Sequence, residues 1–231
     1  MPEYSAGELR KIELLCDLSK SVLAHTAKSC RWRSYGANEQ IIDRQSEATE
    51  VFFVVEGRVR VVNYSISGRE ITLDDVDAGG HFGQLAAIDN EPRSASVMAL
   101  TYCTVAIMPQ DNFLALVNEN SSIALKVMRG LASIIRNSTD RIMDLSTLAA
   151  NNRVQADLLR LALNNHNNNN TACISPIPVH ADIASRVSTT RETVARVMNH
   201  LARQGILERK KNVLIIQDLQ LLQKMVEEIR G

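Results

Sequence analysis

The stretch from Phe82 to Val97, FGQLAAIDNEPRSASV, carries more information on the fold than any other part of the chain. Gly83 is suited to open a short helical turn. The first backbone N–H groups of that turn, those of Gln84 and Leu85, would have no partner inside the helix. A helix start of this kind attracts anions. The stretch therefore predicts an anion site.

The end of the same stretch supplies the other groups that an anion site needs. Arg93 has a donor fork that matches a phosphate, Ser94 adds a hydroxyl, and Ala95 leaves space beside them. Chemistry alone leaves an alternative open, in which the stretch is a β-turn with a surface arginine.

The segments on both sides of this stretch predict β-structure. Short runs rich in Val, Ile, Phe and Thr are separated by Gly, Asn, Asp and Pro. The predicted strands are 51–55, 58–62, 69–76, 94–100 and 103–108. Many short strands at this spacing favour an antiparallel β-barrel or jelly roll.

Two helical segments flank the predicted barrel. Apolar residues at three- and four-residue spacing predict a helix over 6–26, and a second helix is predicted over 113–148. The second carries a heptad-like stripe with two polar interruptions: Val127, Leu131, Ile134, Ser138, Arg141, Leu145 and Leu148. A core helix of a bundle and a long dimerisation helix both fit, and its length favours dimerisation.

The last third of the chain reads as helix, turn, helix and hairpin. A helix is predicted over 153–163, and the asparagine-rich segment 164–170 is expected to be a flexible surface loop. Helices over 180–187 and 190–204 precede strands 206–209 and 213–216, with Asp218 capping a last helix. This order is typical of a winged helix-turn-helix.

The 82–97 stretch resembles the phosphate-binding cassette of cyclic-nucleotide-binding domains. The Phe-Gly start and the Pro-Arg-Ser-Ala end match, and Gly57 and Gly68 lie where that family has turn glycines. The resemblance implies that Arg93 and Ser94 bind a cyclic phosphate. It places Gln84 where the family usually has a glutamate that binds the ribose, and with this amide no charge at that position balances Arg93.

Nearly the whole chain resembles the bacterial cyclic-AMP receptor (CRP/FNR) family. The resemblance implies that Ser138 and Thr139 contact adenine and that Val61 and Leu73 line the same pocket. It implies cyclic AMP as the allosteric ligand, with cyclic GMP as an alternative. Ala149 replaces the family's usual acidic hinge residue, which predicts partial DNA binding without ligand.

The second helix of the predicted helix-turn-helix resembles the recognition helix of the same family. Thr190 is its expected N-cap, and Arg191, Glu192 and Arg196 lie in the first turns, where side chains meet base edges. The motif Arg-Glu-Thr-Val-x-Arg implies binding to TGTGA half-sites. Ser188 stands in the turn where glycine is usual.

These observations predict an α+β chain with three parts. They are a β-barrel ligand domain over 1–112, a dimerisation helix over 113–148 and a winged helix-turn-helix domain over 149–231. We expect a homodimer that binds double-stranded DNA, with RNA polymerase as a further partner. No apolar run reaches the length of a membrane span, and Met1–Arg10 lacks a signal-peptide core, so a cytoplasmic protein is expected.

Composition bears on the alternatives. The net formal charge is zero, although positions 171–231 carry nine basic against six acidic side chains. The cysteines (Cys16, Cys30, Cys103 and Cys173) and the five histidines are dispersed, so no metal site and no enzyme activity are expected. A same-fold regulator that is independent of ligand, or that senses haem or redox state, stays open. A jelly-roll metalloenzyme is the remote alternative.

Overall fold

The computed structural model describes residues 6–163, 166–167 and 170–230. It divides into two compact units, Met1–Ser133 and Ile134–Gly231. Helix α5 (Ser121–Thr147) contributes to both, since its residues up to Ser133 belong to the first unit and the rest to the second.

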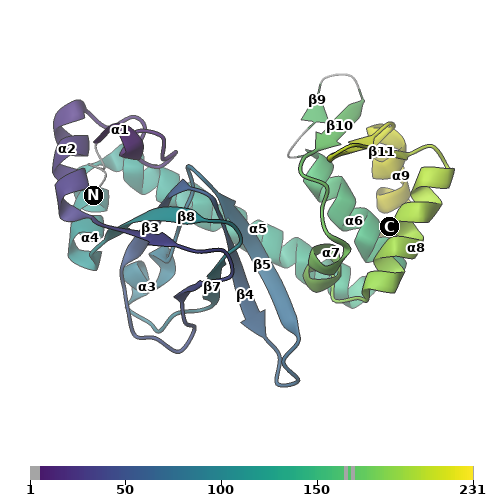
Figure 1. The fold of residues 1–231 in the computed structure, drawn as a ribbon, viewed down its shortest axis with the longest axis horizontal. Coiled ribbons are helices and arrows are strands. Elements are labelled where there is room, and N and C mark those ends of the chain that lie inside the picture. The colour runs from purple at the N-terminus through teal and green to yellow at the C-terminus, as the bar shows by residue number, and fades with distance from the viewer. Residues whose placement is uncertain (1–5, 164–165, 168–169, 231) are drawn as a thin grey trace. The chain divides into compact units, whose positions relative to one another are not determined.

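Two antiparallel four-stranded sheets form the framework of the N-terminal unit (Figure 1). One has the order β1-β8-β3-β6 and the other β2-β7-β4-β5. The strands are β1 (Arg31–Tyr35), β2 (Gln40–Ile42), β3 (Val51–Glu56), β4 (Arg58–Tyr64), β5 (Glu70–Asp77), β6 (His81–Phe82), β7 (Ser96–Ala99) and β8 (Cys103–Met108). The α+β class is confirmed, but the sheets are not closed on each other, so the predicted barrel is an open pair of sheets.

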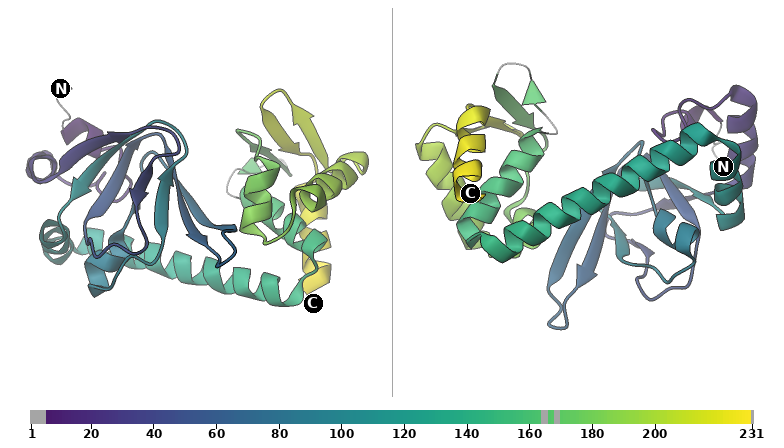
Figure 2. Two further views of the ribbon diagram at one scale, coloured as in Figure 1. Left: turned by 60° about the horizontal axis from the view of Figure 1, so that its bottom comes forward. Right: turned by 180° about the vertical axis from the view of Figure 1, so that it is seen from behind.

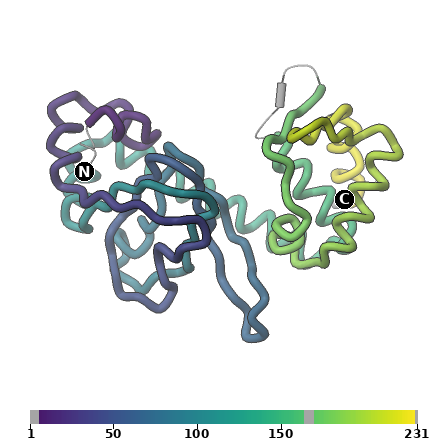
Figure 3. The backbone as a smooth tube through the Cα atoms, in the orientation of Figure 1, coloured from purple at the N-terminus to yellow at the C-terminus, as the bar shows by residue number. Residues whose placement is uncertain are grey.

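Strand β3 is buried on both faces, which explains its unbroken apolar sequence. Phe52 and Val54 belong to the core shared with the second sheet, while Val51 and Phe53 belong to a core covered by helices. The β4–β5 hairpin, by contrast, projects beyond the rest of its sheet (Figure 3), and Ile66 in its turn is fully exposed.

The predicted helix over 6–26 is instead two short helices joined by turns. The structure has α1 (Ala6–Leu9) and α2 (Lys20–Ser29). The backbone N–H of Glu13 donates to the Gly79 carbonyl, 2.9 Å away, which ties the connecting turns to the sheet. Leu9, Ile12 and Leu15 are still buried, so the apolar spacing identified the core side chains but not the backbone between them.

The predicted helix over 113–148 also differs from the structure. Helix α4 (Gln110–Glu119) ends before Asn120, whose backbone is extended, and α5 begins at Ser121. The Asn120 side-chain amide donates to the Leu116 carbonyl at 2.9 Å and closes the end of α4. An asparagine that bonds to local backbone competes with helix continuation.

The apolar surface of α5 is offset from the predicted stripe. Val127 and Leu148 are buried within their own units, and the Arg141 guanidinium donates to the Arg186 carbonyl. The largely exposed apolar side chains include Met128, Ile135 and Ile142, each seven residues after the last.

The described part of the C-terminal unit packs helices around a small sheet (Figure 2). Its helices are α6 (Ala150–Leu163), α7 (His180–Arg186), α8 (Arg191–Arg203) and α9 (Leu219–Arg230). Its strands are β9 (His166–Asn167), β10 (Thr171–Ile174), β11 (Leu207–Lys210) and β12 (Val213–Ile216), in the sheet order β11-β12-β10-β9. Of the predicted 164–170 loop, residues 164, 165, 168 and 169 lie outside the described residues.

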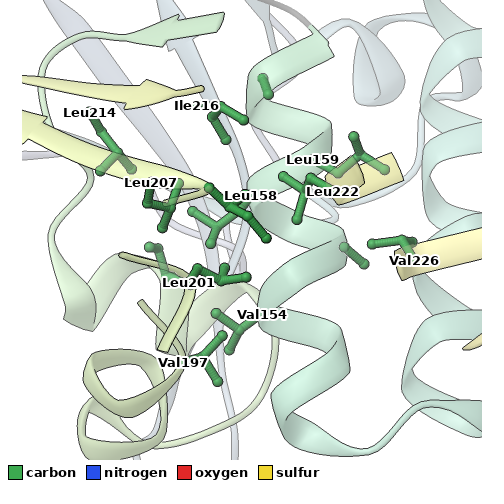
Figure 4. Packing of buried hydrophobic residues seen from close by; sticks show 14 of the residues in the cluster. Val154, Leu158, Leu159, Val197, Leu201, Leu207, Leu214, Ile216, Leu222 and Val226 are labelled. Atoms are coloured by element: carbon green, nitrogen blue, oxygen red, sulfur yellow. The ribbon is translucent and has the colours of Figure 1, made fainter. Parts of the chain in front are cut away.

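One apolar core holds this unit together (Figure 4). Leu158 of α6 lies among Leu201 of α8, Leu207 of β11 and Leu222 of α9. The Asp218 carboxylate accepts a hydrogen bond from the Leu221 N–H at 2.9 Å, so the predicted cap of the last helix is confirmed. The unit therefore has the predicted order of helix, turn, helix and hairpin.

Candidate functional site

The predicted anion site begins at Gly83, directly before the short helix α3 (Gln84–Asp89). Gly83 has φ 84° and ψ 2°, in the left-handed region. A Cβ at this position would lie 2.7 Å from Nη1 of Arg93 and 2.9 Å from the Glu50 carbonyl oxygen. Glycine is therefore required both by the backbone conformation and by the approach of the arginine.

Arg93 is buried beneath this glycine, with 4% of its surface exposed. Its Nη1 donates to the Gly83 carbonyl at 2.8 Å, and its Nη2 donates to the Glu50 carbonyl at 2.7 Å. Its guanidinium carbon lies 5.6 Å from the centre of the Phe52 ring. The Nε atom is buried and has no hydrogen-bond partner among the described residues. A buried donor without a partner is costly, so this atom is suited to an acceptor that the free protein lacks.

The charge next to Arg93 comes from Glu50. Its Oε2 lies 3.8 Å from Nη2 of Arg93, and its Oε1 accepts from Nη2 of Arg31 at 2.9 Å. Burial lowers the pKa of Arg93 from its ordinary value, and the Glu50 carboxylate opposes that shift. The arginine keeps its charge, because guanidinium groups do not lose a proton in proteins.

The other predicted residues of the cassette lie around this arginine in sequence and differ in exposure. Gln84 is half-buried, Leu85 and Ser94 are exposed, and Ala95 is buried. The Ser94 carbonyl accepts from Nδ2 of Asn63 on β4 at 3.3 Å. The structure thus brings the two ends of the cassette together through Arg93 and Gly83.

The predicted wall residues lie on the β4–β5 hairpin. Val61 is half-buried and packs against the core between the sheets, paired with Val97. Leu73 is mostly exposed, at a β-bulge where the pairing of β5 with β4 skips one residue.

Ser138 and Thr139 lie on α5 within the C-terminal unit, and both are exposed. The Thr139 hydroxyl donates to the Ile135 carbonyl at 3.0 Å and can still accept a hydrogen bond.

The predicted DNA reader is α8, and Thr190 is its N-cap, as expected. The Thr190 hydroxyl accepts from the Thr193 N–H at 3.3 Å. Arg191 and Glu192 are exposed in the first turn, and hydrogen bonds from the Glu192 backbone N–H and from Thr190 lower the pKa of the Glu192 carboxyl. Glu192 is therefore an acceptor at neutral pH.

The opposite face of α8 is buried by Val194, Val197 and Leu201. Arg196 is exposed, and its Nη2 lies within hydrogen-bond distance, 3.4 Å, of the Asn151 side-chain oxygen on α6. In the preceding turn, Ser188 has φ 51°, the conformation for which glycine is usual. The residues expected to meet base edges thus lie on the exposed side of this helix.

Sequence reasoning missed two groups of residues. Glu50 carries no motif, because it is one acidic residue before an apolar strand, and only the fold brings it to Arg93. The second group lies in the C-terminal unit, where Asp157 is buried and accepts from the guanidinium of Arg186 at 2.9 Å and from Arg160 at 3.3 Å. Its signal would have been an aspartate on the apolar face of a helix.

Within the part of the chain that the structure describes, no His, Cys, Asp or Glu cluster has the composition of a metal site. A search of the same residues finds no helix with the length and apolarity of a membrane span.

Comparison with known proteins identifies two domains. The model for the cyclic nucleotide-binding domain matches residues 32–120, and the model for the Crp-like helix-turn-helix domain matches residues 152–225. The chain is 28% identical to the cAMP-activated global transcriptional regulator Vfr of Pseudomonas aeruginosa, over 84% of this chain and 91% of that protein. It is 26% identical to the cyclic AMP receptor protein of Thermus thermophilus, over 84% of this chain and 87% of that protein.

Solved structures share this architecture. A CRP/FNR-family transcriptional regulator from Thermus thermophilus superposes with a TM-score of 0.63 at 27% identity, covering 87% of this chain and 100% of the other. A CooA mutant from Carboxydothermus hydrogenoformans has a TM-score of 0.79 at 24% identity, covering 98% and 97% of the two chains, and this likeness is one of fold.

These features thus belong to a transcription regulator: Arg93 is buried under the Gly83 turn, and helix α8 is capped by Thr190 and exposed at its first turn. The regulator combines a cyclic nucleotide-binding domain with a DNA-binding helix-turn-helix. The chain belongs to the CRP/FNR family.

Proposed function

We propose that this regulator is a homodimer that responds to cyclic AMP and binds palindromic TGTGA-type sites. One observation carries the ligand proposal. Arg93 is almost fully buried under Gly83, and its donor Nε has no hydrogen-bond partner in the part of the chain that the structure describes. An anion held beside α3 would satisfy that donor and gain a charge-assisted bond.

The proposed ligand contacts are those implied by the cassette and by the relatives named as cAMP-activated. The residues are Gly83, Gln84, Leu85, Arg93, Ser94 and Ala95, with Val61, Leu73, Ser138 and Thr139. Cyclic GMP presents the same phosphate and ribose, so the base decides between the two ligands. The proposed functional division assigns 1–112 to the ligand, 113–148 to the dimer and 149–231 to DNA.

Calorimetry with cyclic AMP and with cyclic GMP tests the ligand. We expect tighter binding of cyclic AMP, and a loss of affinity when Ser138 and Thr139 are both replaced by alanine. Gln84→Glu should keep or improve affinity, because a carboxylate is the stronger acceptor for a ribose hydroxyl. Equal affinity of the double alanine variant would contradict the adenine contact.

The dimer proposal rests on the exposed apolar side chains of α5. Ile135 and Ile142 are 66% and 63% exposed and one heptad apart, which is the spacing of a coiled-coil seam. We expect Ile135→Lys and Ile142→Lys to give monomers in light scattering, whereas Ile66→Lys, on the exposed β4–β5 turn, leaves the dimer intact. These positions are a sharper test than Leu131, which packs against the N-terminal core.

Gel-shift titration on a palindromic TGTGA-N6-TCACA site, at fixed salt, tests the DNA proposal. The proposed base and backbone contacts are Thr190, Arg191, Glu192 and Arg196. Arg191→Ala should remove the preference for this site and leave weak non-specific binding. RNA polymerase is the proposed protein partner, and action on DNA implies action in the cytoplasm.

The neutral Gln84 favours a second candidate, a regulator of the same fold that binds DNA without cyclic AMP or answers to another effector. The same titration separates the two candidates. We expect partial binding without ligand and a clear increase with cyclic AMP. Equal affinity in both arms would favour the second candidate, and an absorption spectrum with metal analysis would then test for haem or a metal.

A further inference from the structure

The negative charge near Arg93 does not come from the position where the family usually has a glutamate. The cassette itself contributes the neutral Gln84, and the carboxylate nearest to Arg93 is that of Glu50, on the segment that leads into β3. Glu50 is in turn paired with Arg31, at 2.9 Å. Arg31, Glu50 and Arg93 thus form a chain of ion pairs next to the proposed phosphate position.

Glu50 contacts Arg93 in two chemically different ways. Its backbone carbonyl accepts from Nη2 at 2.7 Å and holds the guanidinium in place. Its carboxylate lies farther away, at 3.8 Å, and is not needed for that hold. A change of the side chain from carboxylate to amide can therefore alter the charge while the bond that positions Arg93 remains.

We infer that the Glu50 carboxylate is a specificity determinant that makes the cassette select singly charged cyclic phosphates over doubly charged linear phosphates. The inference rests on the proposed binding of cyclic nucleotides. The chain of ion pairs Arg31–Glu50–Arg93 has a net formal charge of +1. A cyclic phosphodiester has one negative charge and balances it. A linear phosphomonoester has nearly two at neutral pH, because its second pKa is about 6, so its second charge meets the carboxylate without compensation.

The size of the effect follows from Coulomb's law. The negative charge of a bound phosphate would lie several ångströms from the half-buried Glu50 carboxylate. The repulsion energy then lies between the Coulomb energy in water and that near a protein surface, and we take it as roughly a five- to tenfold change in affinity. The cyclic phosphate has one negative charge and the linear phosphate nearly two, so the repulsion energy is about twice as large for the linear ligand.

Calorimetry with cyclic AMP and 5′-AMP, on the full chain, tests this inference. Glu50→Gln should bind cyclic AMP about fivefold more tightly and 5′-AMP more tightly still, so that the preference for the cyclic ligand falls by about fivefold. Arg31→Gln should act in the opposite direction, with a smaller change of about twofold, because this side chain is mostly exposed and screened. Both changes should shrink as salt is raised.

Glu47→Gln is the matched control, since Glu47 is an exposed carboxylate on the same segment. It should leave the preference unchanged, and an effect equal to that of Glu50→Gln would overturn the inference. So would weaker binding of both ligands by Glu50→Gln, because the carboxylate would then support Arg93 instead of opposing the ligand. A wild-type protein that binds neither nucleotide would overturn the proposed ligand class and the inference with it. Normal wild-type binding with an unchanged preference in Glu50→Gln overturns the inference alone.

Discussion

Arg93 in the N-terminal unit and Arg153 in the C-terminal unit are both held by backbone carbonyl oxygens. Arg153 donates from Nε to Val187, from Nη1 to Leu148 and from Nη2 to Ser188, at 2.8 to 3.1 Å. Arg93 uses only its two terminal nitrogens in this way, and within residues 6–163, 166–167 and 170–230 its Nε has no hydrogen-bond partner.

The difference separates an arginine with a structural role from one that keeps a donor for the proposed ligand. In Arg153 each of the three nitrogens binds a carbonyl, and those carbonyls lie at the ends of α5 and α7, where helices leave carbonyl groups without partners. In Arg93 the same kind of hold fixes the guanidinium but leaves a donor for an incoming anion. Arg93 is buried and Arg153 is partly buried, but the difference on which this comparison rests is the number of nitrogens that donate to a carbonyl, two in Arg93 and three in Arg153.

The largest effect on ligand affinity is expected from a conservative change of Arg93, and the matched change of Arg153 is its comparison. Arg93→Lys should weaken cyclic AMP binding by about 100-fold, because one ammonium cannot hold both carbonyls and also meet the phosphate. Arg153→Lys should instead lower the free energy of unfolding by about 2 kcal/mol, through the loss of two hydrogen bonds, with ligand affinity nearly unchanged. Calorimetry measures the first effect and urea unfolding the second.

Separate readouts make this comparison clean. The single tryptophan, Trp32, lies in the N-terminal unit, so its fluorescence follows that unit, while far-UV circular dichroism follows both. A loss of ligand binding in Arg153→Lys equal to that in Arg93→Lys would break the distinction between the two arginines.

Asp157 provides a second test of a structural charge in the C-terminal unit, this time of a carboxylate. The carboxylate is almost fully buried between Arg186 and Arg160. Asp157→Asn removes the carboxylate that binds Arg186, while Arg160 keeps its ion pair with Asp144 at 3.2 Å. We expect the free energy of unfolding of the C-terminal unit to fall by about 3 kcal/mol. Asp140→Asn, at an exposed position on α5, should change it by less than about 0.5 kcal/mol. Similar losses in both variants would show that the buried pairing is not the cause.

Gly83→Ala tests Arg93 through the glycine whose carbonyl it binds. The new Cβ would meet Nη1 of Arg93, and the left-handed φ of 84° is unfavourable for alanine. We expect a loss of about 2 kcal/mol in the stability of the N-terminal unit, followed by Trp32 fluorescence, together with weaker binding of cyclic AMP. Gly68→Ala is the control, because φ is 76° there but the added Cβ meets nothing within 4 Å. It should lose stability without losing affinity.

These two arginines also show what the sequence could predict. The cassette around Arg93 is local, since Gly83 and Arg93 are ten residues apart, so a motif was enough to find them. The partners of Arg153 are up to 35 residues away and are backbone carbonyls, which have no residue signature. Glu50 was missed for a similar reason, because it lies 43 residues from Arg93 in the sequence and only the fold brings the two together.

The helices give a similar lesson. The sequence predicted α8 nearly to its bounds, because that helix has a threonine cap and ends near a glycine. Apolar spacing joined 6–26 and 113–148 into single helices, because the turns after α1 and at Asn120 keep apolar residues facing the core. Periodicity reports which side chains are buried and is less sensitive to a break of the backbone between them.

The smallest expected effect concerns the carbonyl that Nη2 of Arg153 binds, which belongs to Ser188. This residue has φ 51°, where a Cβ costs about 1 to 2 kcal/mol relative to glycine. Glycine loses about 0.4 to 1 kcal/mol through the greater freedom of the unfolded chain, so Ser188→Gly should stabilise the C-terminal unit by about 0.5 kcal/mol. For a unit of this size that is a rise of about 2 to 4 °C in Tm, measurable by circular dichroism.

Lys211→Gly, at φ 49° in the β11–β12 turn, should give a similar gain without touching Arg153. If Arg153 imposes the left-handed turn, the gain from Ser188→Gly will shrink in an Arg153→Lys background while that from Lys211→Gly stays the same. Equal gains in both backgrounds would mean that the turn is set by its own sequence and that Arg153 only binds it.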